Sequence, residues 1–476
     1  MSASERSQGA AAAEPVEQAL YEVRKKIYPR AVTGVFALWR WVAVWATQLV
    51  FYGLPWLTWN DRQAVLFDLV HRKFYIFGLV FWPQDIVYLT VLLIISAYSL
   101  FLFTAVGGRL WCGYACPQTV YTEIFMWIER KIEGDRMKRM KLDKGPLSGR
   151  KLALKAAKHG AWIALALWTG FTFVGYFTPI ADLAAKVMQW SLGPWETFWV
   201  FFYGFATYGN AGWMREQVCK YMCPYARFQS VMFDRDTLII TYDNDRGEPR
   251  GARAKSADHK AKGLGDCVDC GICVQVCPTG IDIRNGLQYE CIGCAACIDG
   301  CNQVMGKMGY PKGLIRYSSE HALEEKFDFA QMVRRVVRPR ILIYTAVLWT
   351  IIIAAGLTLG NRVPVKVDVI RDRITMAAPD DPQVQNVYRL AIMNTSEQSR
   401  QFRISVTGLE GLALEAEAQP VTVGGASQRV IPVRLRVDKE KTIPGANPIV
   451  FTVETVGTEE PIVITERATL IAPKTE

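Results

Sequence analysis

The chain has 476 residues, enough for two or three domains, and 51% of them are hydrophobic. Together with 15 tryptophans, which favour the bilayer interface, this content predicts membrane segments joined to soluble domains and argues against a single buried bundle. The net charge is +10, and the basic residues concentrate between 109 and 158, directly after an apolar stretch. That placement favours lipid headgroups over nucleic acid as the acidic partner.

The first 32 residues are polar and lack the apolar core of a cleavable signal peptide, so the first apolar stretch is predicted to stay as an anchor. Arg40, within that stretch, is interpreted as extending its charged end to the nearby interface. Lys and Arg precede the first stretch, follow the second and lead into the fifth, which places the N-terminus inside and the C-terminus outside. Five stretches reach the roughly 20 residues that cross a bilayer, and they lie at 33–54, 86–106, 159–179, 193–213 and 340–360.

A cysteine motif occurs twice in the membrane part, as Cys112-Gly-Tyr-Ala-Cys116-Pro117 and as Cys219-Lys-Tyr-Met-Cys223-Pro224. Each copy follows an even-numbered stretch and leads into an amphipathic run, at 121–132 and at 228–233. Residues 33–235 are therefore predicted to form a core of two similar helical hairpins, with both motifs at the cytoplasmic edge.

Proline directly after each second cysteine suits the first turn of a following helix. The thiols would then lie at a positive helix end, which lowers their pKa. Four such thiols, Cys112, Cys116, Cys219 and Cys223, could bind a soft ion such as Cu(I), or exchange electrons as dithiol and disulfide. A third interpretation is plain packing of small buried side chains.

The remaining eight cysteines form two tandem runs with the spacing of bacterial ferredoxins, and none is left over for a disulfide scaffold. In two-cluster ferredoxins the fourth thiolate comes from the other run. One [4Fe–4S] cluster is therefore assigned to Cys267, Cys270, Cys273 and Cys301, and the other to Cys291, Cys294, Cys297 and Cys277. Zinc prefers two close pairs and fits these runs poorly. Asn302 stands where a proline is usual, but that proline ligates nothing.

Beyond the fifth stretch, short runs alternate apolar and polar residues between Gly and Pro, which predicts an Ig-like β-sandwich of about seven strands. This tail has no cysteine or histidine, so a catalytic role is not expected of it. The runs lie at 365–369, 388–392, 402–406, 430–437, 449–453 and 462–465.

The predicted fold is thus a multi-domain membrane protein with an α-helical core, a two-cluster ferredoxin-like α+β insert and a C-terminal Ig-like β-sandwich. We divide the chain into a cytoplasmic segment (1–32), the transmembrane core (33–235), a cytoplasmic 2[4Fe–4S] domain (236–339), the last transmembrane helix (340–360) and a periplasmic Ig-like domain (361–476).

Histidines are sparse, and His71, His159, His259 and His321 form no local motif. They are interpreted as surface or interface residues. No pair of histidines lies on the spans, and no GxGxxG opens a strand–helix unit, which argues against haem b and bound NAD.

In this combination the chain resembles the CcoG/FixG/RdxA family, over nearly its whole length from about Tyr28. The resemblance rests on paired CxxxCP motifs, the two-cluster insert and the β-sandwich tail. NapH-type quinol dehydrogenases look similar in the membrane and cluster parts but lack the tail.

The resemblance implies a bacterial inner-membrane cupric reductase that supplies Cu(I) for assembly of a cbb-type cytochrome c oxidase. Copper would pass to a copper-exporting P-type ATPase, and the implied copper-handling residues carry over onto Cys112, Cys116, Cys219 and Cys223. Electrons would come from an unidentified donor. Two alternatives are a NapH-like quinol-oxidising subunit and an assembly scaffold whose β-sandwich docks an oxidase subunit.

Overall fold

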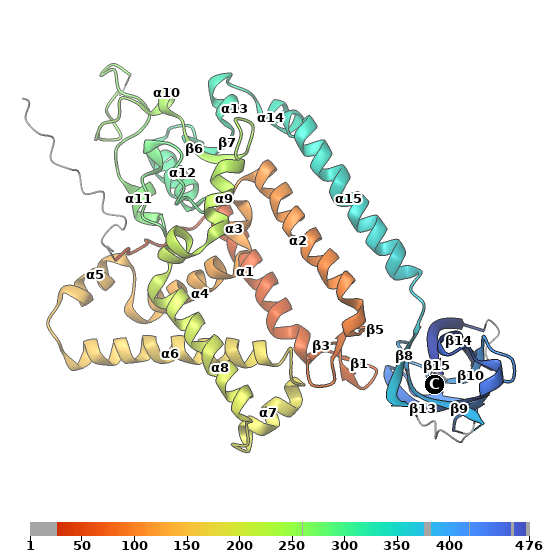
Figure 1. Ribbon diagram of the computed structural model, residues 1–476. Coiled ribbons are helices and arrows are strands. Elements are labelled where there is room, and N and C mark those ends of the chain that lie inside the picture. The colour runs from red at the N-terminus through yellow and green to blue at the C-terminus, as the bar shows by residue number, and fades with distance from the viewer. Residues whose placement is uncertain (1–25, 259, 376–381, 418, 458–460, 473–476) are drawn as a thin grey trace, which may run out of the picture.

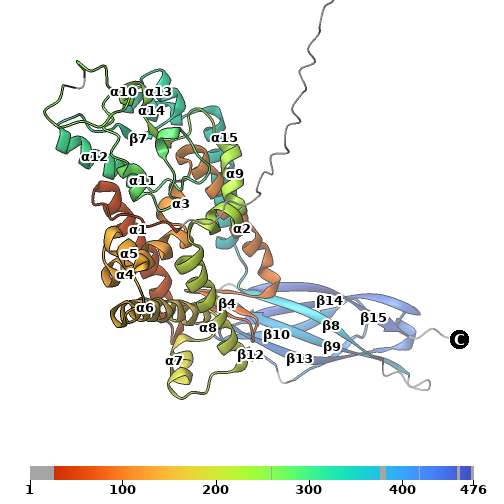
Figure 2. The same cartoon turned by 90° about the vertical axis from the view of Figure 1, so that its left-hand side faces the viewer.

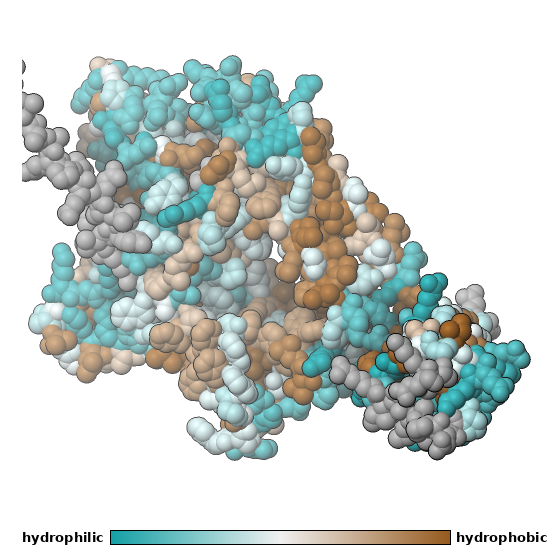
Figure 3. All heavy atoms as spheres, viewed as in Figure 1, coloured by the Kyte–Doolittle hydropathy of each residue, from teal (hydrophilic) through white to brown (hydrophobic). Residues whose placement is uncertain are grey.

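The computed structural model describes residues 26–472 except 259, 376–381, 418 and 458–460. Within these residues, three helices are long and apolar enough to cross a membrane. They are α1 (Val35–Gly53), α2 (Ile86–Gly107) and α15 (Pro339–Gly360), which match the first, second and fifth predicted stretches. Figure 3 shows hydrophobic side chains along α2 and α15, between hydrophilic surfaces at the two ends of the molecule. The hydrophobic side chains of α2 and α15 therefore form a band about as tall as the hydrocarbon core of a bilayer.

The third and fourth predicted stretches fall on α6 (Gly149–Val174) and α8 (Pro194–Thr207). The α6 helix begins in basic residues, and α8 continues into a π-helix, η3 (Tyr208–Met214). The two helices approach closely at glycine, since a Cβ on Gly170 would lie 2.2 Å from the carbonyl oxygen of Val200. Such small-residue contacts are common between membrane helices. Five spans stay a prediction.

A small β-structured insert lies between α1 and α2, and the sequence patterns did not predict it. Its strands are β1 (Thr58–Trp59), β2 (Arg62–Gln63), β3 (Val65–Asp68), β4 (Lys73–Ile76) and β5 (Leu79–Phe81). The last three form an antiparallel sheet in the order β3-β4-β5. Runs of two to four residues are too short to show a clear alternation.

The CxxxCP motifs lie in a layer of helices at one end of the membrane core, and its position at the cytoplasmic edge stays a prediction. The elements are α3 (Leu110–Tyr114), α4 (Pro117–Glu133), α5 (Arg136–Lys144), η4 (Val218–Met222) and α9 (Pro224–Met232). Both α4 and α9 begin at the proline that follows the second cysteine. The predicted helix starts are therefore confirmed. The first cysteine of the second motif lies in a π-helix, whereas that of the first motif lies in an α-helix.

The α+β insert is built on two short helices and a two-stranded sheet. They are α11 (Ile272–Val276) and α12 (Ala296–Met308), with β6 (Ile239–Tyr242) paired antiparallel to β7 (Ile315–Ser318). The peripheral helices are α10 (Asn244–Gly247), α13 (Glu320–Glu324) and α14 (Phe329–Val336). Its core contains Ile240, Ile298, Met305 and Leu314 beside the cysteines.

The C-terminal part is a β-sandwich of two four-stranded sheets in the orders β12-β10-β14-β15 and β11-β13-β9-β8. Its strands are β8 (Val365–Thr375), β9 (Gln383–Asn394), β10 (Arg400–Thr407), β11 (Ala413–Glu415), β12 (Val421–Val423), β13 (Ser427–Asp438), β14 (Gly445–Val456) and β15 (Val463–Ala472). The described residues thus hold eight strands, one more than predicted, because two of them are only three residues long. Alternate residues such as Leu390, Phe402 and Phe451 fill the core.

The sandwich and the α+β insert lie at opposite ends of α15 (Figures 1 and 2). The sandwich docks on the small β-structured segment (β1 to β5) between α1 and α2. There Arg362 contacts the buried carboxylate of Asp85 at 2.6 Å, and Lys366 contacts the same carboxylate. Trp82 packs against Ala391 and Met393 beside this ion cluster. The two soluble parts are therefore separated by the length of the apolar helices.

Candidate metal centres

The first cysteine set surrounds a small cavity in the α+β insert. Its thiol-bearing residues are Cys267, Cys270, Cys273 and Cys301, the last from the first two turns of α12. Most of the other lining residues are apolar, such as Ile272, Met305 and Leu314, and Tyr242 and Arg284 complete the wall. Four soft donors around a dry cavity fit a [4Fe–4S] cubane, so these residues could hold one.

The second set surrounds a neighbouring small cavity. It is lined by Cys291, Cys294 and Cys297, and by Cys277 from the first run. The residue that separates the two cavities is Cys273, which lines both. Cys301 is absent from the lining of this cavity, and Cys277 is absent from that of the first. Each cavity is thus lined by three cysteines of one run and the fourth cysteine of the other, the grouping expected from the spacing; that these sets bind clusters stays a prediction.

Both runs use the same unusual backbone around their second cysteine. Asp269 and Gly271 flank Cys270 with φ of 51° and 62°, and Gly293 and Ala295 flank Cys294 with φ of 70° and 58°. These left-handed residues turn the chain around each cavity so that successive thiols point inward. At Gly293 a side chain is also excluded by space, because a Cβ would lie 2.9 Å from the carbonyl oxygen of Arg109.

Two buried arginines tie the second set to the membrane core. Arg40 of α1 is 8% exposed, and its Nη1 donates to the carbonyl oxygen of Cys294 at 2.8 Å. Arg109 is 7% exposed, and its Nη1 donates to the carbonyl oxygens of Tyr289 and, at 3.2 Å, Cys291. The interpretation of Arg40 as a side chain that extends to the interface is therefore wrong. Its partner is 254 residues away in the sequence, which no local pattern reveals.

The four CxxxCP cysteines gather beside the second set. Cys112 lies in α3, Cys116 caps α4, Cys219 lies in η4 and Cys223 precedes α9. Cys219 is close enough for its pKa to be raised by the charges of the other three thiols. Cys112 and Cys219 also pack against the buried cluster that contains Cys294. The two halves of the repeat thus bring their thiols to one place.

The contact between α3 and the second set is direct. A Cβ on Gly113, the residue after Cys112, would lie 2.7 Å from the carbonyl oxygen of Gly293 and 2.9 Å from the Cα of Cys294. Only glycine permits this approach of the two backbones. It leaves the first CxxxCP motif separated from a cubane ligand by a single layer of main chain.

The pKa values of Cys112, Cys116 and Cys219 are raised, contrary to the prediction from helix position. Burial raises the pKa of Cys112 to about 11 and that of Cys219 to about 12, and neighbouring thiols add to both. Burial also raises the pKa of Cys116, although the backbone N–H groups of Gln118 and Thr119 act in the opposite direction. The helix end is present, but desolvation of the thiolate outweighs it.

A buried cluster of charged side chains, which the sequence did not predict, packs against the layer of helices that carries the CxxxCP motifs. Glu129 of α4 contacts Arg139 at 2.9 Å and Arg215 at 3.1 Å, and Lys158 of α6 contacts Glu133 at 3.0 Å. Burial alone would raise the pKa of Glu129, but Arg215, Arg139 and Lys158 hold it below its usual value. An amphipathic pattern could have suggested a polar face here, but not that it is buried. The cluster fixes α4 and α5 against α6 and the segment that leads to Cys219.

The described histidines make local contacts outside the cysteine sites. His71 bonds Asp68 at 2.7 Å, His159 lies 3.0 Å from the hydroxyl of Tyr208, and His321 bonds Asp236 at 3.0 Å. His259 lies outside the described residues. Among the described residues, no three His, Cys, Asp or Glu side chains form a site for a single metal ion. A cubane needs more widely spaced thiolates than one ion does.

Sequence comparison places the chain among known proteins. It is 37% identical over 462 residues to "Nitrogen fixation protein FixG" of Rhizobium meliloti, which covers 89% of this chain and 88% of the relative. It is 38% identical over 409 residues to "Protein RdxA" of Cereibacter sphaeroides, covering 83% and 85%. The chain belongs to the FixG/RdxA family. A weaker relative of this FixG/RdxA chain is "Ferredoxin-type protein NapH" of Haemophilus influenzae, 25% identical over 229 residues, or 45% of this chain and 68% of that protein.

Three family profiles match separate parts of the FixG/RdxA chain. A "4Fe-4S dicluster domain" matches residues 214–320, a "4Fe-4S binding domain" matches 89–134, and the "IG-like fold at C-terminal of FixG" matches 355–473. The predicted family and the Ig-like tail are thereby confirmed. The chain is a membrane-type iron–sulfur electron-transfer protein.

Proposed function

We propose that this FixG/RdxA chain is a membrane-anchored cupric reductase. Cys267, Cys270, Cys273 and Cys301 hold one [4Fe–4S] cluster, and Cys291, Cys294, Cys297 and Cys277 hold the other; when bound, these groups carry single electrons. The observation that carries the proposal is the packing of Cys112 and Cys219 against the Cys294 loop. A substrate held by these thiols lies next to the place where electrons leave the α+β insert.

The chemistry of the thiols suits copper as the substrate. Each Cu(II) accepts one electron and becomes Cu(I), which soft thiolates stabilise over Cu(II) and so make easier to form. Because burial keeps Cys112 and Cys219 protonated near neutral pH, a bound ion must displace their protons. No acid–base step on a substrate is required.

Sidedness and partners follow from the same proposal. We place the chain in the bacterial inner membrane with five spans, the α+β insert in the cytoplasm and the Ig-like domain in the periplasm, in agreement with the basic flanks. Cu(I) released at the cytoplasmic edge would be taken by a copper-exporting P-type ATPase, and with other assembly factors it would serve a cbb-type oxidase.

The test uses purified full-length protein, reduced anaerobically with dithionite and freed of excess reductant. Cu(II) should reoxidise the clusters of the native protein, with one Cu(I) formed per electron. In the double variant Cys116→Ala with Cys223→Ala, Cu(II) should reoxidise the clusters only at the slow rate expected when no thiol site holds the copper. The iron content of the protein should stay unchanged. Native rates in this double variant would exclude the thiols as the copper site.

Two other functions remain testable beside this one. Similarity to NapH favours a quinol-oxidising subunit, for which reoxidation would require a protein partner and not copper. The docking of the sandwich through Arg362 and Asp85 favours a scaffold. Deleting 361–476 separates the scaffold: oxidase maturation would then be lost while copper reduction continues.

A further inference from the structure

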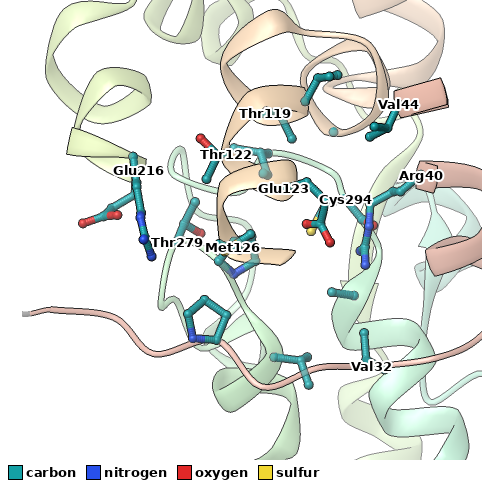
Figure 4. A pocket seen from close by; sticks show the side chains of 18 of the residues that line it. Val32, Arg40, Val44, Thr119, Thr122, Glu123, Met126, Glu216, Thr279 and Cys294 are labelled. Carbon is teal, nitrogen blue, oxygen red and sulfur yellow. The ribbon is translucent and has the colours of Figure 1, made fainter. Parts of the chain in front are cut away.

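The two cysteine sets differ in their access to solvent. All eight predicted cluster ligands lie within the described residues, and Cys270 of the first set is the exposed one. In the second set Cys294 is buried. Figure 4 shows its side chain beside Arg40 of α1 and Glu123 of α4. A soluble molecule can therefore approach the first set at Cys270, while the membrane core covers the second set at Cys294.

A basic loop is fastened to the first set. This loop (residues 250–258 and 260–262) carries five Lys and Arg residues and one Asp. The backbone N–H of Gly251 donates to the carbonyl oxygen of Cys267 at 3.2 Å, and the guanidinium of Arg253 donates to the same oxygen at 3.2 Å. The start of the basic loop is therefore fixed beside the cavity of the first set.

The loop has positive charge that its own neighbours do not neutralise. The acidic side chains nearby are engaged with other cations, since Asp266 pairs with Arg246 at 2.6 Å and Asp269 pairs with Arg284 at 2.6 Å. Within the described residues, no carboxylate forms an ion pair with the three lysines of the loop, and all three are exposed. These lysines are Lys255, Lys260 and Lys262.

The position of the basic loop favours a soluble partner over lipid headgroups. The loop follows α10, which lies at the end of the molecule away from the sandwich (Figures 1 and 2). Figure 3 shows a hydrophilic surface at that end, beyond the hydrophobic side chains along α2. The charges of the loop therefore face solvent and not the predicted bilayer.

We propose that the basic loop is the docking surface of the electron donor, and that this donor is an acidic soluble protein that gives up one electron at a time. In each encounter the donor loses one electron and the first set gains it, and no covalent bond is made or broken. Cys273 lines the cavities of both sets, so the electron has a short path toward the CxxxCP thiols.

The surface suits this kind of partner. Transient redox encounters use small interfaces, so a short loop beside one exposed ligand is sufficient. Opposite charges on the two proteins raise the rate of encounter more than they raise affinity, which lets the donor leave after each electron. This donor role rests on the proposed electron-transfer function.

The experiment uses the full chain in detergent, anaerobic and with oxidised clusters, and reduced flavodoxin as an acidic one-electron donor. At low salt the triple variant Lys255→Gln, Lys260→Gln and Lys262→Gln should be reduced about tenfold more slowly than the native protein, because electrostatic steering is weakened. At about 1 M salt, where charges are screened beyond about 3 Å, the two rates should converge. Stopped-flow measurement of the visible absorbance of the clusters follows the reaction.

A matched control removes the same charge elsewhere. Lys138, Lys141 and Lys144 are exposed residues of α5. Changing all three to Gln should leave the rate of reduction by flavodoxin at the native value. Dithionite should reduce every variant fully, which shows that the clusters are intact. Native rates in the loop variant at low salt would overturn the proposal.

Cross-linking supplies a readout that does not depend on electron transfer. A carbodiimide should join carboxylates of oxidised flavodoxin to Lys255, Lys260 or Lys262, and high salt should abolish the product. Cross-links confined to α5, or protection of the three lysines from acetylation by anionic lipid vesicles but not by flavodoxin, would contradict the docking surface. Copper reduction by the dithionite-reduced native protein is measured separately, so failure of the docking surface and failure of the copper site are distinguishable.

Discussion

The two cysteine sets share one backbone plan but lie in different surroundings. Around the first set, Arg284 is paired with Asp282 at 2.7 Å and Asp269 at 2.6 Å, and the half-buried Arg253 donates to the carbonyl oxygen of Cys267 at 3.2 Å. Around the second, Arg40 and Arg109 arrive from the membrane core and are buried. The two sets thus have the same loop conformation but different neighbours. We call the first set the outer set and the second set, next to the membrane core, the inner set.

This difference gives the two sites different tasks. The inner set adjoins the CxxxCP thiols, so under the proposed function electrons would leave the α+β insert there. The outer set has no such neighbours among the described residues, and under the same proposal it would hold a second electron. Changes at equivalent positions of the two sets should therefore have unequal effects.

The largest expected effect tests which cysteines share a site. In the double variant Cys267→Ser with Cys301→Ser, both changes fall on the outer set, so about half of the iron should remain. In Cys267→Ser with Cys277→Ser, one ligand is lost from each set, and almost all of the iron should be lost. Iron and acid-labile sulfide analysis of anaerobically purified protein measures both. Equal iron contents in the two variants would contradict the exchange of fourth ligands.

The next effect concerns the thiols beside the inner set. Since the pKa of Cys112 is raised from 9.0 to about 11, its thiolate fraction near neutral pH should be about a hundredfold below that of an ordinary thiol. Alkylation by iodoacetamide should therefore be slow at pH 7 and rise about tenfold per pH unit until pH is about 11. Mass spectrometry of copper-free protein follows the reaction, with a peptide of residues 108–118 as the reference. A plateau below pH 9 would show that the thiol is ionised more easily.

A glycine pair compares the two loops directly. Gly293→Ala places a Cβ 2.9 Å from the carbonyl oxygen of Arg109 and keeps φ at 70°, so it should destabilise the loop by about 2–5 kcal/mol. Gly271→Ala keeps φ at 62° but meets nothing closer than 3.9 Å, which predicts only about 1–2 kcal/mol. The temperature at which cluster absorbance disappears should fall further for Gly293→Ala. The reverse order would mean that Arg109 does not contact this loop.

These positions also show what the sequence could predict. The spacing predicted which cavity Cys277 and Cys301 would each line, because the runs are local and follow the known ferredoxin pattern. The Ig-like strands followed from alternation, except the two shortest. Arg40 and the thiol pKa values did not follow, because both depend on burial created by residues far away in the sequence. Sequence patterns report local geometry, and desolvation is a property of the assembled core.

The smallest expected effect separates the electrostatics of the two sets. Arg109 and Arg253 each donate at 3.2 Å to a carbonyl oxygen of a cysteine, Cys291 and Cys267 respectively, but only Arg109 is buried. Removing a positive charge favours the oxidised cluster, and a buried charge is less screened by water. Arg109→Gln should therefore lower one midpoint potential by on the order of 60 mV, a tenfold change in a one-electron equilibrium. Arg253→Gln should lower the other by clearly less. EPR-monitored redox titration resolves both, and an equal shift in the two variants would show that solvent screens the inner set as fully as the outer one.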